Sequence, residues 1–85
     1  VLLSERGALD DARQAYERAL AADPGQADAW LNLGVVHKCR GRLPDAIAAY
    51  QRALQLQPAH ALAQANLAVA LTDYGTALKQ AGRAR

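Results

Sequence analysis

Residues 27–60 read ADAWLNLGVVHKCRGRLPDAIAAYQRALQLQPAH, and this stretch decides the fold because its features recur at a fixed distance along the chain. Identical residues stand 34 positions apart: Gly7 and Gly41, Ala12 and Ala46, Tyr16 and Tyr50, Ala19 and Ala53, Pro24 and Pro58, Ala27 and Ala61, Asn32 and Asn66, Leu33 and Leu67, Val35 and Val69. A period of about 34 residues is typical of stacked helix–turn–helix repeats. Such arrays act through an extended surface rather than a catalytic pocket. The sequence therefore predicts an all-α solenoid of antiparallel helix pairs whose function is binding.

The composition narrows the function classes. The chain has 85 residues, at most one domain, and its first residue Val1 and its cut repeat frame lead us to expect a piece of a longer protein. The net charge of +2 does not favour nucleic acid as a partner, and no apolar run reaches the roughly 18 residues that would span a membrane. The single cysteine, Cys39, excludes an internal disulfide and fits a reducing compartment. We expect an intracellular protein that binds other proteins.

Residues 1–26 are expected to form the C-terminal part of one unit. We predict the tail of a helix over residues 1–6, a break at Gly7, and a second helix from about 8 to 22, because glycine tolerates the left-handed conformation that ends helices. Asp23, Pro24 and Gly25 end the second helix, since a proline disfavours helix in the residue before it.

Residues 27–60 are expected to form one complete unit. The first helix should run from about 27 to 40, and Gly41 should break the chain. The second helix should run from about 43 to 56, with Pro44 in its first turn, where a missing amide hydrogen costs nothing. Pro58 closes this unit as Pro24 closes the one before it.

Residues 61–85 begin a further unit in which the period is disturbed. If the 34-residue frame held, Gly75 would be the turn. The alternative is a first helix lengthened by seven residues, with Gly82 as the turn. This longer helix carries one apolar stripe at spacings of three and four: Leu67, Leu71, Tyr74, Leu78 and Ala81. We favour the longer helix, because seven residues are nearly two helical turns and keep that stripe in line.

The repeated residues differ in size in a way that predicts how the helices pack. Small residues should lie where helices approach most closely: Gly34, Ala68, Ala12 and Ala46. Aromatic residues should fill the remaining space, Tyr16 and Tyr50 at the junction with the following unit and Trp30 within its own. The final helix has no following partner, so we expect an apolar edge that favours self-association or fraying, formed by Leu62, Leu67, Leu71 and Leu78.

The central unit resembles the tetratricopeptide repeat pattern W-x2-L-G-x2-Y…A-x3-F…P, through Trp30, Leu33, Gly34, Ala46, Tyr50 and Pro58. His37 stands where tyrosine is usual, and Tyr50 where phenylalanine is usual. The resemblance extends along the whole chain. It implies an interaction module that recognises segments of other proteins.

Two stretches carry a narrower resemblance. Residues 29–38, AWLNLGVVHK, and residues 65–76, ANLAVALTDYGT, are similar to the repeat region of SPINDLY-type protein O-glycosyltransferases. Members of that family have a similar A-L-T-D-x-G-T segment in a repeat with a long first helix. The resemblance implies a parent protein of the nucleus or cytoplasm that modifies Ser or Thr of other proteins. Its sugar-nucleotide catalytic domain is absent from these 85 residues.

The first helix of each stacked unit lines the concave side of the array. We therefore expect the protein-binding residues there: Asp28, Leu31, Asn32, Val35, Lys38 and Cys39 in the central unit, and Leu62, Ala65, Asn66, Val69, Thr72 and Asp73 in the next. In the related O-glycosyltransferases, asparagines repeated in this way hold the backbone of an extended protein, which implies that role for Asn32 and Asn66. An amide offers a donor and an acceptor to a peptide group. The alternative is that both are simply solvated polar residues.

The remaining residues indicate neither catalysis nor a cofactor. The sequence has no glycine-rich phosphate loop and no nucleophile elbow, and His37 and His60 lack further zinc ligands at suitable spacing. We interpret Cys39 as a buried, inert thiol and His37 as a packing residue. A carboxylate clamp in the concave groove is disfavoured, because Lys38 is the only basic residue on that stripe. Arg40 and Arg42 are interpreted as solvated arginines beside a turn.

Overall fold

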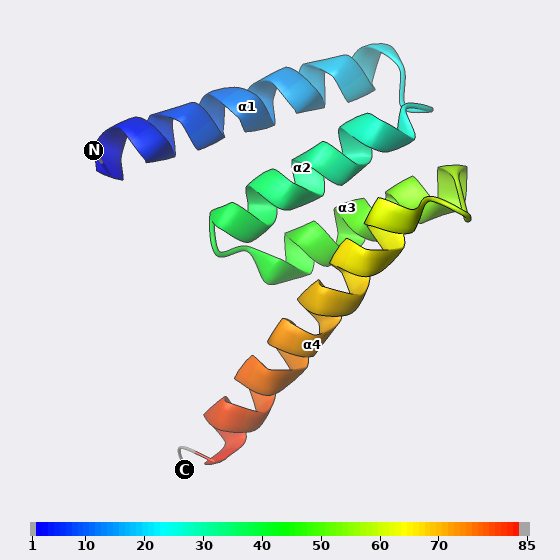
Figure 1. Cartoon of the computed structure of the whole chain (residues 1–85). Helices are drawn as coiled ribbons and strands as arrows, with labels where there is room; N and C mark the ends of the chain where they lie inside the picture. Colours follow the sequence, from blue (N-terminus) through cyan, green and yellow to red (C-terminus); the bar gives the residue numbers. More distant parts are fainter. Residues whose placement is uncertain (1, 84–85) are drawn as a thin grey trace.

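The computed structural model describes the backbone of residues 2–83 and the side chains of residues 7–76, 78 and 79. It contains four helices, α1 (Leu2–Ala22), α2 (Ala27–Cys39), α3 (Leu43–Leu56) and α4 (Ala61–Arg83), and the described residues form no strand. Consecutive helices run in opposite directions, and the C-terminal half of α4 projects beyond the other three (Figure 1). The principal-axis extents are 45 × 36 × 17 Å, so the helices form a flat array rather than a closed bundle. The expected all-α solenoid is confirmed.

The hairpin of α2 and α3 follows from Gly41 and Pro44. Gly41 has a φ of 78°, the left-handed conformation that glycine adopts at least cost, and it is the only described residue with a positive φ. The amides of Arg40 and Arg42 donate to the last carbonyls of α2, at 3.0 Å to Val36 O and 2.8 Å to His37 O. Pro44 lies in the first turn of α3, where its missing N–H leaves no carbonyl unpaired. Both expected helices of the central unit are therefore confirmed.

Tyr50 fills the space between the helices of the central unit. Its side chain is fully buried, and a methyl group at Gly34 would lie 2.5 Å from its ring. Tyr50 belongs to a buried hydrophobic cluster. Its other members are Leu31 of α2, Ala46 and Ala53 of α3, and Ala63 and Ala70 of α4. Gly34 and Ala46 thus permit close approach as expected, and Tyr50 also reaches the junction with α4. Ala68 is exposed, so its expected role at a close approach is wrong.

A second cluster joins α1 to α2. Leu20, Ala29 and Leu33 are buried there, with Tyr16 and Trp30 partly buried against them. Tyr16 fills the junction with the following unit, as expected. Trp30 packs against both clusters, and its indole N–H donates to Pro24 O at 3.0 Å. Trp30 therefore connects the turn before its unit to both neighbouring helices instead of filling its own unit alone.

The predicted break at Gly7 is wrong, because α1 is one continuous helix from Leu2 to Ala22. A glycine in a helix interior costs only about 1 kcal/mol relative to alanine. No proline follows Gly7 to block the next turn, in contrast to Gly41, which is followed closely by Pro44. A single glycine among helix-forming residues was therefore insufficient to end the helix.

The third unit has the longer first helix, since α4 continues through Gly75. It also includes Gly82 and extends to Arg83, the last residue whose backbone is described. Ala63 and Ala70 are buried against α3, and Leu67 packs beside them, which corrects its assignment to the open edge. Leu62, Leu71 and Leu78 are 64%, 48% and 56% exposed, which confirms the edge at those three positions. The side chain of Ala81 lies outside the described residues.

Candidate functional site

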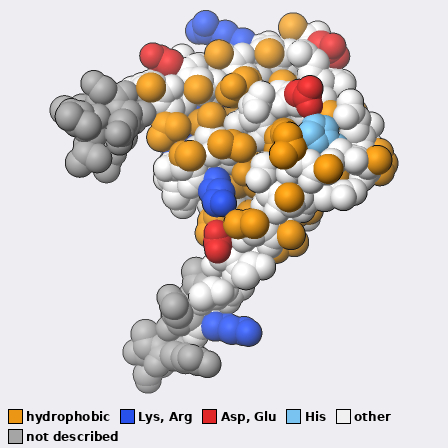
Figure 2. Space-filling model, viewed as in Figure 1, with side chains coloured by type: hydrophobic (Ala, Val, Ile, Leu, Met, Phe, Trp, Pro, Cys, Tyr) orange, Lys and Arg blue, Asp and Glu red, His pale blue; other side chains and the backbone are white. Residues whose placement is uncertain are grey.

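One side of α2 is turned away from both core clusters. Its exposed residues follow a single stripe at spacings of four, three and four: Asp28, Asn32, Val35 and Cys39. The first half of α4 lies beside it and exposes Leu62, Ala65, Val69, Thr72 and Asp73, with Asn66 half-buried. We call these ten residues the α2–α4 surface. Hydrophobic side chains gather over α2 and the first half of α4 on the face shown in Figure 2, with few charged groups among them.

Leu31, one residue of the expected stripe, does not belong to this surface. Leu31 is only 7% exposed and belongs to the buried cluster that contains Ala63 and Ala70. It points to the side of α2 that α4 covers, so it supports the surface from below and cannot contact a partner. Lys38 is half-buried. Cys39 is exposed, so the interpretation as a buried thiol is wrong.

Asp28 is held by His60, a contact that no sequence pattern indicates. The Nε2 of His60 lies 2.8 Å from Oδ1 of Asp28, and its Nδ1 accepts the amide hydrogen of Ala63 at 3.3 Å. In this arrangement His60 caps the first turn of α4 and donates to Asp28, as a neutral imidazole can do. The side chain of Asp28 remains 83% exposed. The pair aligns the N-terminal ends of α2 and α4, and its sequence separation of 32 residues gave no signal.

Asn32 and Asn66 keep their amide groups available. Asn32 is exposed and Asn66 is half-buried. Among the described residues neither side chain has a hydrogen-bond partner, whereas neighbouring polar groups such as Thr72 bond to their own helix, at 2.9 Å to Ala68 O. Exposed Val35 and Val69 lie one turn beyond them. The surface thus combines amides that can donate and accept hydrogen bonds with exposed apolar groups.

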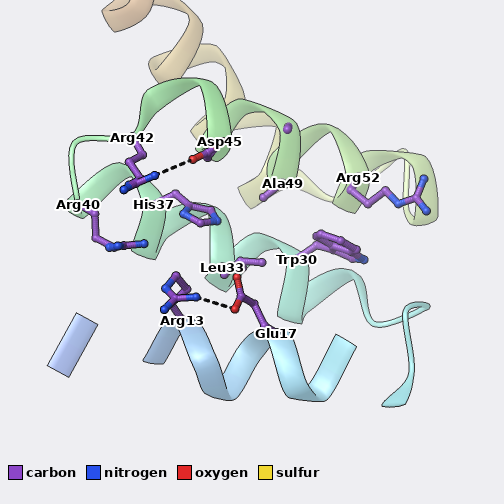
Figure 3. Close-up of a pocket in the computed structure, with 11 residues that line it drawn as sticks. Arg13, Glu17, Trp30, Leu33, His37, Arg40, Arg42, Asp45, Ala49 and Arg52 are labelled. Atoms are coloured by element: carbon purple, nitrogen blue, oxygen red, sulfur yellow. Dashed lines mark hydrogen bonds and ion pairs between the residues drawn. The ribbon is translucent and has the colours of Figure 1, made fainter. Parts of the chain in front are cut away.

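The opposite side of α2 forms the floor of an open cavity of about 680 Å³, with α1 and α3 as its walls (Figure 3). We call it the α1–α3 groove. Its lining residues are Arg13 and Glu17 from α1, Trp30, Leu33 and His37 from α2, Arg40 and Arg42 from the turn, and Asp45, Ala48, Ala49 and Arg52 from α3. The arginines come from separate elements and form no local sequence pattern, so nothing in the sequence indicates this site. Arg40 is not simply solvated, since its side chain is only 22% exposed.

Ion pairs in the groove differ in quality. Arg13 Nη1 bonds to Glu17 Oε1 at 2.7 Å, a short charge-assisted contact within α1. Arg40 Nη2 lies 3.3 Å from Oδ1 of Asp10, just outside the lining. Arg42 Nη1 lies 3.8 Å from Oδ2 of Asp45, beyond hydrogen-bond distance. The arginines are therefore matched to carboxylates unevenly along the groove.

Arg52 has no carboxylate partner among the described residues. Its Nη1 bonds to Gln55 Oε1 at 3.0 Å, and its guanidinium carbon lies 5.8 Å from the centre of the Trp30 ring. The aromatic face attracts the cation and orients it without neutralising its charge.

His37 lies on the floor of the groove. Burial lowers its pKa; Asp45 and Glu17 act in the opposite direction, while Arg40 and Arg13 lower it further. Its Nδ1 is buried and has no hydrogen-bond partner within the described part of the chain. A buried nitrogen of this kind retains an unmet capacity to donate or accept.

Within residues 2–83 no helix has the length and apolar character needed to cross a membrane. The described residues contain no group of three His, Cys, Asp or Glu side chains that could hold a metal ion. The side chains of Arg83 and Arg85, at the C-terminal end of the chain, lie outside the described residues.

A comparison with known families supports the repeat assignment. The family model described as "Tetratricopeptide repeat" matches residues 2–61, which include α1, α2 and α3 in full. A comparison with curated proteins finds no match to the chain.

Proposed function

Because the chain belongs to the tetratricopeptide repeat family, whose repeats are generally protein–protein interaction modules, we propose that its α2–α4 surface binds extended segments of other proteins. Asn32 and Asn66 hydrogen-bond to the backbone of the bound segment. Val35, Leu62 and Val69 contact its side chains.

The observation that carries the proposal is the pair of unengaged amides on adjacent first helices. Asn32 and Asn66 are one repeat apart, and neither side-chain amide forms a hydrogen bond to the described part of the chain. An extended polypeptide exposes N–H and C=O groups at regular intervals, and one amide side chain can pair with both. Binding through the backbone tolerates many sequences, so the surface suits a module with several protein partners.

The double variant Asn32→Ala, Asn66→Ala tests this role. Binding is measured on an array of extended 15-residue peptides and in pull-down experiments with partner proteins. We expect the signal to fall across the array while helicity, followed by circular dichroism, is retained. The matched control is Gln14→Ala, Gln51→Ala, which also removes two exposed amides, from α1 and α3. Equal binding by the double variant and the unsubstituted chain would count against the proposal.

We further propose that the surface selects substrates for a protein O-glycosyltransferase of the nucleus or cytoplasm. Support comes from the resemblance of residues 29–38 and 65–76 to SPINDLY-type repeats and from the long first helix, α4. In the full-length parent, the double asparagine variant should lose transfer to protein substrates and keep hydrolysis of the nucleotide sugar. A parent without a sugar-nucleotide domain would remove this enzymatic role and leave the binding role in place.

A second candidate function is oligomerisation through the C-terminal half of α4. Leu71 and Leu78 are 48% and 56% exposed there, and Tyr74 lies between them with 36% exposed. A continuous apolar edge of this kind favours contact with a second apolar surface. Sedimentation equilibrium at high concentration separates the two functions: a dimer that Leu71→Lys dissociates would support oligomerisation, and a monomer would exclude it.

A further inference from the structure

We propose that the α1–α3 groove is a second binding site, separate from the α2–α4 surface, and that it takes an acidic segment of a partner protein. The ligand is an extended peptide whose carboxylates bind the groove arginines. The proposal does not depend on the function of the α2–α4 surface.

The two sites lie on opposite sides of one helix. Trp30, Leu33 and His37 form the groove floor, whereas Asp28, Asn32 and Val35 belong to the other surface. At 100° per residue, the centres of these two stripes are about 165° apart around α2. A single straight segment therefore cannot occupy both, and each site can be altered without touching the other.

The charges of the groove favour an anionic ligand. Four arginines line it, against two carboxylates, Glu17 and Asp45, with Asp10 adjacent. Arg52 carries the least compensated of these charges, because its described contacts are the neutral side chains of Gln55 and Trp30. A guanidinium has five N–H donors arranged to match a carboxylate, so most of those of Arg52 remain available.

The end of the groove opposite Arg52, near Arg42 and His37, also has polar groups that can bind a ligand. The Arg42–Asp45 pair is long, at 3.8 Å, and both side chains are more than half exposed, so Arg42 can change partner at little cost. His37 adds a buried Nδ1 with no partner among the described residues. Between the ends, Trp30 and Leu33 provide an apolar floor (Figure 3).

The spacing of the two ends defines the ligand further. Arg42, directly before α3, and Arg52, within α3, are ten residues apart, which corresponds to a helical rise of about 15 Å. An extended chain advances about 3.3 Å per residue, so four or five residues cover this distance. The fitting segment therefore has acidic side chains four or five positions apart, with apolar or small residues between them.

The test uses a fluorescein-labelled peptide with two glutamates five positions apart, separated by valine and threonine, and a second peptide in which both glutamates are glutamine. Fluorescence anisotropy measures affinity for the 85-residue chain. The indole N–H signal of Trp30, the only tryptophan, reports the place of binding by NMR. We expect saturable binding of the glutamate peptide, a shift of the Trp30 signal, and weaker binding as salt is raised.

Arg52→Gln should weaken binding of the glutamate peptide about tenfold, because it removes one charge-assisted contact. The matched control is Arg18→Gln, which removes the same charge from an exposed position of α1 outside the groove and should leave the affinity within about twofold. The variant Asn32→Ala, Asn66→Ala should also bind normally, which separates this site from the α2–α4 surface.

Four outcomes would overturn the proposal. They are no binding of the glutamate peptide, equal binding of the glutamine peptide, equal losses in Arg52→Gln and Arg18→Gln, and binding without any change at Trp30. Circular dichroism of each variant verifies that a lost affinity is not lost folding.

Discussion

The two sides of α2 differ in chemistry although they belong to one helix. The α2–α4 surface offers amides and aliphatic groups, whereas the α1–α3 groove offers arginines, carboxylates and an indole. The difference follows from the stacking order. The first helices of successive units, α2 and α4, approach each other closely. The second helices, α1 and α3, have no Cα atoms within 8 Å of each other among the described residues, and a groove lies between them. One helix thus contributes to two surfaces of different chemistry.

Both surfaces depend on Tyr50, so its removal should disrupt the two surfaces together. The buried ring joins α2, α3 and α4. Tyr50→Ala should lower the free energy of unfolding by about 3–5 kcal/mol, which is most of the stability of a small domain. Chemical denaturation measures the loss. Tyr74→Ala, on the exposed half of α4, is the control and should change stability by no more than about 0.5 kcal/mol.

Gly34 sets the distance between the floor of the groove and α3. A methyl group there would meet the Tyr50 ring at 2.5 Å, so Gly34→Ala should destabilise by about 1–3 kcal/mol. Gly75→Ala has open space around it in the middle of α4 and should stabilise by about 0.5–1 kcal/mol. Melting temperatures of the two variants should move in opposite directions; a parallel change would contradict the packing.

His60 should affect the α2–α4 surface alone. It caps α4 and holds Asp28, so His60→Ala should cost about 1 kcal/mol and accelerate hydrogen exchange in the first turn of α4. The affinity of the α1–α3 groove for the glutamate peptide should be unaffected. Faster exchange throughout α2 and α3 would show that the pair is not local.

His37 should give the groove its own pH dependence. Burial lowers its pKa in the folded state, so the unfolded chain binds more protons as the pH falls below the ordinary value of about 6.5. The contribution of neutral His37 to stability is therefore present above that pH and is lost as the pH falls below it. As the pH falls, the free energy of unfolding of the unsubstituted chain should therefore decrease relative to that of His37→Gln. A pH-independent difference would mean that His37 is not desolvated.

Turn-forming residues and apolar periodicity made much of the fold predictable from sequence. Gly41 and Pro44 defined the hairpin, and the apolar stripe through Gly75 indicated the length of α4. The wrong predictions concerned features that depend on how helices pack and on neighbouring residues. The periodicity of the sequence showed which side of α2 carries Leu31. It gave no indication that α4 covers this side chain. Gly7 is a glycine, the residue type that often ends helices, but no neighbouring residue prevents the helix from continuing.

The candidate sites were less predictable for the same reason. The asparagine pair is visible as a repeat, because Asn32 and Asn66 occupy equivalent positions. The groove arginines are contributed by α1, by the turn and by α3, so they come together only when the helices stack. The Asp28–His60 pair likewise joins residues with no shared pattern.

The most direct test of the binding account is the NMR signal of the side-chain amides of Asn32 and Asn66 during titration with an extended, uncharged peptide that the array identifies as a binder. The account predicts that both amide signals shift together and saturate at one concentration while the Trp30 indole signal stays in place. Binding that moves Trp30 and leaves both asparagine amides unchanged would contradict it.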